Sequence, residues 1–179
     1  MLRSDVPGSR PTLLSSCALA TTAAEARFRI SRPDTPTRDA RVIAIDEHAA
    51  VLVRAAAAAR AWRGGHFLVF DRVASSLGND DDGPADAVLR TPDGAVTLLS
   101  AELEGADLVV MVATAAARPE AASVIGDACA ERMIMSAGLV AAGQGLAGPV
   151  VSALRPNAMV LVVLDSGRDV TEILTALRV

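Results

Sequence analysis

Residues 106–114 read ADLVVMVAT, and this apolar segment is the strongest indication of the fold class. Six consecutive apolar residues, three of them valine, stand between Asp107 and Thr114. Near-continuous apolar runs of this length are typical of strands in parallel sheets, because such strands are covered on both faces. We therefore predict a central parallel strand over residues 106–114.

Other runs of strand type recur on both sides of this stretch, at residues 41–45, 66–70, 134–141 and 158–164. Segments with the composition of helices stand between or after them, at residues 49–62, 119–132, 149–154 and 169–178. Alternation of this kind predicts an α/β fold, a Rossmann-like three-layer domain with a mainly parallel sheet. We expect residues 158–164 (AMVLVVL) to form a buried strand, like residues 106–114.

A hairpin is expected in addition to the parallel strands. Residues 87–90 and 95–99 flank Thr91-Pro92-Asp93-Gly94, and the Pro-Asp-Gly order favours a tight turn. The first 40 residues contain four prolines and little apolar periodicity. The sequence thus predicts a flexible N-terminal arm over 1–40 and one Rossmann-like α/β domain over 41–179.

Composition excludes several classes of function. The net charge of −4 offers no clustered positive charge for nucleic acid or for an anionic membrane, so we expect neither partner. The chain contains no lysine and no tyrosine, which excludes Schiff bases, Walker-A phosphate binding and Tyr–Lys dehydrogenase chemistry. No stretch approaches the ~18 apolar residues of a membrane span, and the N-terminus lacks a signal-like apolar run, so a cytoplasmic protein is expected.

Acidic residues directly follow three of the predicted strands. In a parallel sheet Asp46, Asp71 and Asp165 would end at the same edge, where carboxylates could bind Mg²⁺. An aspartate after a strand more commonly caps the next helix or turn. We favour capping and predict no metal site.

A glycine-rich motif follows the predicted strand at residues 134–141. Gly143, Gly145 and Gly148 match G-x-G-x-x-G, and Asp165 ends the next strand about 20 residues on. That order would place a pyrophosphate at a helix N-terminus and a ribose hydroxyl on Asp165. Because Pro149 follows immediately and the helix is short, a flexible connecting loop is the favoured interpretation.

The loop after the central strand is a candidate anion site. Thr114 ends the strand, and a helix beginning near Pro119 would present free N–H groups and a partial positive charge. Arg118 would add a charged donor at that helix start. We therefore list Thr114 and Arg118 with the glycine motif as candidate cofactor-binding residues.

Two hypotheses of function remain. The favoured one is a non-catalytic Rossmann-like accessory protein that binds an anionic small molecule, a protein partner or a second copy of itself. The alternative is an oxidoreductase-like enzyme that binds a nucleotide or dinucleotide through the strand-end loops. The strand at residues 106–114 also resembles the ADLVV strand of Rossmann-type reductases. The sequence assigns no catalytic residue and identifies no cofactor.

Overall fold

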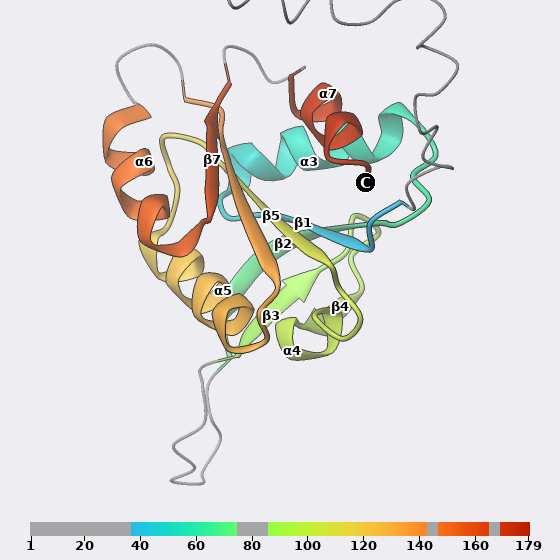
Figure 1. Ribbon diagram of the computed structural model, residues 1–179, viewed down its shortest axis with the longest axis horizontal. Coiled ribbons are helices and arrows are strands. Elements are labelled where there is room, and N and C mark those ends of the chain that lie inside the picture. Colours follow the sequence, from blue (N-terminus) through green and yellow to red (C-terminus); the bar gives the residue numbers. More distant parts are fainter. Residues whose placement is uncertain (1–36, 75–85, 143–146, 165–168) are drawn as a thin grey trace, which may run out of the picture. The chain divides into compact units, whose positions relative to one another are not determined.

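The computed structural model describes residues 37–74, 86–142, 147–164 and 169–179 (Figure 1). Its strands are β1 (Ala40–Ala44), β2 (Gly65–Val73), β3 (Ala87–Arg90), β4 (Val96–Leu98), β5 (Leu108–Ala113), β6 (Met135–Val140) and β7 (Val160–Val163). Its helices are α3 (Glu47–Ala59), α4 (Leu99–Glu102), α5 (Pro119–Glu131), α6 (Ala147–Leu154) and α7 (Asp169–Ala176), with a 3₁₀ turn η1 (Arg155–Asn157).

The described strands form one mixed sheet in the order β4-β3-β2-β1-β5-β6-β7. Strands β2, β1, β5, β6 and β7 run parallel, while β3 and β4 are antiparallel additions at one side. The five parallel strands, counted among themselves, have the order 2-1-3-4-5, which is common in doubly wound sheets. The predicted α/β class and the added hairpin are confirmed, and β5 is the middle parallel strand.

Helices cover both faces of the sheet, because successive side chains of a strand point to opposite faces. On one face Val42 and Ala44 of β1 pack with α3 and α7. On the other face Ile43 and Ile45 pack with α4, α5 and α6. The two cores are built mainly from alanine, valine, leucine and isoleucine, so close helix-to-sheet packing needs few aromatic side chains.

Local sequence signals explain where several elements begin and end. Asp46 is the N-cap of α3 and accepts a hydrogen bond from the Ala49 N–H, while Pro119 occupies the first turn of α5. Gly94 has a φ of 94° in the hairpin turn, where the Thr91 N–H donates to the Ala95 carbonyl. The turn chemistry seen in the sequence therefore positions the hairpin.

One expectation about burial is wrong. Residues 158–164 were expected to contain a fully buried strand, but β7 is the edge strand of the sheet, and Val160 and Val163 are each 50% exposed. Only β6 pairs with it among the described residues. An apolar run indicates that a segment forms a strand, but it does not indicate how many other strands lie beside it.

The predicted arm over residues 1–40 lies almost wholly outside the described residues, and β1 begins at Ala40, the last residue assigned to that arm. Helices long and apolar enough to cross a membrane are absent from the described segments.

Candidate functional site

A cavity of about 430 Å³ lies at the carboxyl ends of the parallel strands. It is lined by His48 and Leu52 of α3, by Thr114 to Ala116 after β5, and by Ala141 and Ala142 after β6. Doubly wound sheets bind ligands at this edge, next to the point where the strand order reverses. Here that point is between β1 and β5, so the cavity lies at the expected place.

Asp46 connects the start of α3 to the loop after β5, next to this cavity. Its Oδ1 accepts hydrogen bonds from the Ala49 N–H and the Thr114 hydroxyl, each at 2.8 Å, and its Oδ2 accepts the Thr114 N–H at 2.7 Å. The residue is buried, and three donors compensate its charge. Asp46 therefore caps α3 and anchors the loop after β5, which confirms capping for this residue.

The cavity wall is mostly apolar, and His48 is the single ionisable side chain among the described residues that line it. Four of the lining residues are alanines, Leu52 adds a larger apolar surface, and the Thr114 hydroxyl is already engaged by Asp46. His48 is exposed, and no hydrogen bond joins its ring to another described residue. His48 stands two residues after the Asp46 N-cap, and this spacing is the sequence signal that places it at this edge.

Arg118 does not line the cavity. Its guanidinium donates to the carbonyls of Phe70 and Asp71 at 3.0 and 3.1 Å and lies 4.9 Å from the centroid of the Phe70 ring. A register shift at this point leaves Asp71 unpaired in the β2–β3 ladder. Arg118 thus satisfies carbonyls at a β-bulge and ties the α5 start to β2, while its role as an anion anchor stays a prediction.

The glycine motif is described only in part. Gly143, Gly145 and Asp165 lie outside the described residues. Gly148 is in the first turn of α6, is exposed, and a Cβ added there would meet nothing within 4 Å. The close helix-to-strand packing that the third glycine of a dinucleotide motif permits is therefore not required of Gly148.

Other candidate reactive groups are engaged in structural contacts. Burial raises the pKa of the Cys129 thiol to about 11, so that this thiol is uncharged at neutral pH. His66 Nδ1 lies 3.2 Å from Oε2 of Glu102, which also lies 3.4 Å from Nε of the buried Arg41. Arg41 and His66 are paired near the amino ends of β1 and β2, far along the strands from the cavity edge.

Asp71 is likewise held by arginines. The side-chain hydrogen bond from Arg90 lowers the pKa of Asp71, and Arg72 forms a second ion pair with the same oxygen. Groups of three or more histidine, cysteine, aspartate or glutamate side chains placed to hold a metal ion are absent from the described residues. The carboxylates of Asp46 and Asp71 do not converge, since each has its own partners.

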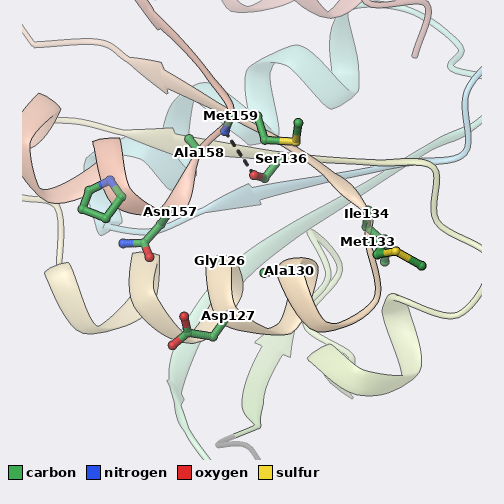
Figure 2. A pocket seen from close by; sticks show the side chains of 10 residues that line it. Gly126, Asp127, Ala130, Met133, Ile134, Ser136, Asn157, Ala158 and Met159 are labelled. Carbon is green, nitrogen blue, oxygen red and sulfur yellow. Dashed lines mark hydrogen bonds between the residues drawn. The ribbon is translucent and has the colours of Figure 1, made fainter.

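A second cavity, of about 460 Å³, lies at the opposite end of the strands (Figure 2). Gly126, Asp127 and Ala130 of α5 form one side, and Pro156 to Met159 form the other. The buried Ser136 hydroxyl accepts a hydrogen bond from the Met159 N–H at 3.3 Å. Met133 and Met159 are 93% and 75% exposed, so apolar side chains form part of the rim of this cavity, together with Asp127 and Asn157.

Neither a protein-family model, nor a curated protein, nor a solved structure matches the chain. The candidate site is therefore defined by the geometry of the described residues.

Proposed function

We propose that the chain is a Rossmann-like binding protein without its own catalytic machinery, accessory to a partner, that takes a small, mainly apolar molecule in the cavity beside His48. The observation that carries this proposal is the position and lining of that cavity. It stands at the strand edge where doubly wound sheets hold ligands, and its walls are alanines and a leucine.

The charges around the cavity favour a neutral or weakly polar ligand over a phosphate. Asp46 is buried directly beneath Thr114, and Glu47 adds a second carboxylate at the start of α3. The nearest arginine along the loop, Arg118, donates to backbone carbonyls. The described lining residues offer no arginine to pair with an anion, whereas an apolar group would replace water against alanine side chains.

His48 supplies the polar contact that orients such a ligand. Its imidazole can donate from one nitrogen and accept at the other, so it can pair with a hydroxyl, a carbonyl or an amide of the bound molecule. Among the described residues, no hydrogen bond joins His48 to a cysteine or serine that could act as an activated nucleophile. The arrangement supports binding with orientation better than it supports covalent catalysis.

A thermal-shift panel tests this proposal. The panel contains small aromatic and aliphatic alcohols, amides and acids on one side, and nucleotides and dinucleotides with Mg²⁺ on the other. A ligand present at 100 times its dissociation constant adds about 2.7 kcal/mol, which corresponds to a rise of roughly 5–10 °C in melting temperature. We expect the apolar members to give the hits.

Two tryptophan variants decide whether a hit uses this cavity. Ala115→Trp fills the mouth from an exposed loop position and should abolish the shift. Ala58→Trp places the same side chain on the exposed part of α3 and should leave the shift unchanged. Hits that survive Ala115→Trp, or a panel without apolar hits, would reject the proposed site.

The nucleotide-binding alternative retains one supporting observation. The glycine motif begins after β6 and ends in the first turn of α6, and β7, which pairs with β6 in parallel, ends two residues before Asp165. This is the order of elements around a dinucleotide motif. A shift produced by NAD or ATP, and by none of the apolar molecules, would favour this alternative over our proposal.

A further inference from the structure

Within the part of the chain that the structure describes, no strand pairs with the outer side of β7. β7 ends the sheet, and among the described residues only β6 pairs with it. Half of the backbone N–H and C=O groups of an edge strand point away from the sheet and can pair with another strand. Figure 1 shows β7 at the margin of the sheet, with α6 to one side.

Edge strands of monomeric proteins are usually protected by charged residues, proline or a bulge, because an apolar edge recruits other strands. The residues of β7 are Val-Leu-Val-Val, preceded by Met159, and none of them carries a charge. Met159 is largely exposed, and the valines at both ends of the strand, Val160 and Val163, are half exposed. The edge therefore offers backbone pairing and apolar contact together.

We propose that β7 pairs antiparallel with β7 of a second copy of this chain, so that the two sheets join across a twofold axis. This inference goes beyond the proposed ligand function and does not depend on it. A twofold axis brings the same surface of both copies together, so the surface must be complementary to itself. An uncharged strand meets this condition without like-charge repulsion, although the chain as a whole has a net charge of −4.

The pattern of exposure along the strand fits such pairing. Side chains alternate between faces, so Met159, Leu161 and Val163 share one face, and Leu161 packs against the core there. Antiparallel pairing centred on Leu161 places Met159 opposite Val163 of the second copy, on the same face. The pairing thus covers the two most exposed apolar side chains of that face with each other.

Sedimentation of the full chain over a concentration series tests the proposal. We expect a reversible equilibrium between the 18.4 kDa chain and a dimer of twice that mass. Val163→Lys should raise the dissociation constant at least about tenfold, because pairing would bury an unpaired ammonium group. Val96→Lys, which changes an exposed valine on the opposite edge strand β4, should leave it unchanged.

Three results would overturn the proposal: a parent chain that stays monomeric at roughly 100 µM, a dimer that persists in Val163→Lys, or a dimer that Val96→Lys dissociates. Circular dichroism checks that each variant folds. If Val163→Lys fails to fold, Met159→Lys replaces it, since Met159 precedes the strand and is more exposed. Retention of the dimer in that variant would then reject pairing through β7.

Discussion

Strands β5 and β7 have nearly the same composition and opposite surroundings. β5 reads Leu-Val-Val-Met-Val-Ala and is buried at all six residues. β7 reads Val-Leu-Val-Val, and none of its four residues is fully buried. The difference comes from their neighbours, because β5 lies between β1 and β6 while β7 pairs only with β6 among the described residues.

Burial of a strand is therefore a property of the sheet order, and the sheet order depends on contacts between residues far apart in sequence. Apolar composition predicts that a segment is extended and at least partly covered. It does not say how many strands will lie beside the segment. The same residues can thus serve as the centre of a core or as a surface that pairs with another chain.

The largest expected effect that tests this comparison is the loss of stability when one valine of each strand is replaced by aspartate. Val110→Asp places a carboxylate among α3 side chains with no partner, so we expect a loss of more than about 4 kcal/mol and failure to fold. In the monomer, Val163→Asp leaves its carboxylate in contact with water, so at concentrations where the chain is monomeric we expect a loss below about 1 kcal/mol. Urea unfolding followed by circular dichroism measures both, and similar losses would contradict the contrast.

Much of the fold could be predicted from local signals. The hairpin turn, the cap of α3 at Asp46 and the proline at the start of α5 each act within a few residues, and the structure has all three. The edge position of β7 could not be predicted in this way. Nor could the bulge at Asp71, because it depends on how β3 pairs with β2 beyond the end of β1.

The sequence predicted where a site would lie, at the carboxyl ends of the strands, better than it predicted which side chains would be available there. Topology places the residues after each parallel strand at one edge, and Thr114 lines the cavity there. Arg118 follows the same strand, but its contacts with Phe70 and Asp71 are determined by tertiary packing. A charged residue in the right loop does not by itself show which atoms it will contact.

An effect of intermediate size is the dependence of the free energy of unfolding on alkaline pH. It involves Cys129 of α5, which is buried in the core between α5 and the sheet. Burial raises the pKa of this thiol from 9.0 to about 11. Below pH 9 the thiol is protonated in both the folded and unfolded states, whereas above pH 9 only the unfolded state releases the proton readily. The free energy of unfolding should therefore fall by up to about 2–3 kcal/mol between pH 9 and pH 11.

This alkaline loss can be isolated because the chain has no lysine or tyrosine to titrate in the same range. Urea unfolding at pH 8, 9, 10 and 11 would measure it in a Cys17→Ser background, which removes the other thiol. Cys129→Ala in that background should show a flatter pH dependence. An equal slope in both proteins would show that Cys129 is not shielded as the packing of α5 implies.

The smallest expected effect is a change in melting temperature when a helical glycine is replaced by alanine, in α6 near the edge of the sheet or in α5 nearer its centre. Gly148 in α6 is exposed, its φ is not positive, and an added Cβ would meet nothing within 4 Å. Gly148→Ala should therefore stabilise the fold by about 0.4–1 kcal/mol, mainly by reducing the entropy of the unfolded chain. The melting temperature should rise by roughly 1–4 °C.

Gly126 in α5 provides the matched control with the opposite sign. A Cβ there would lie 2.6 Å from the Cβ of Asn157 and 2.9 Å from its backbone Cα, so the 3₁₀ turn before β7 would have to move. Gly126→Ala should lower the melting temperature, because overpacking at a helix contact costs typically about 1–3 kcal/mol. If both substitutions lower it, the start of α6 is more constrained than its exposure indicates, and the motif around Gly148 would then need its glycine for a reason other than chain flexibility.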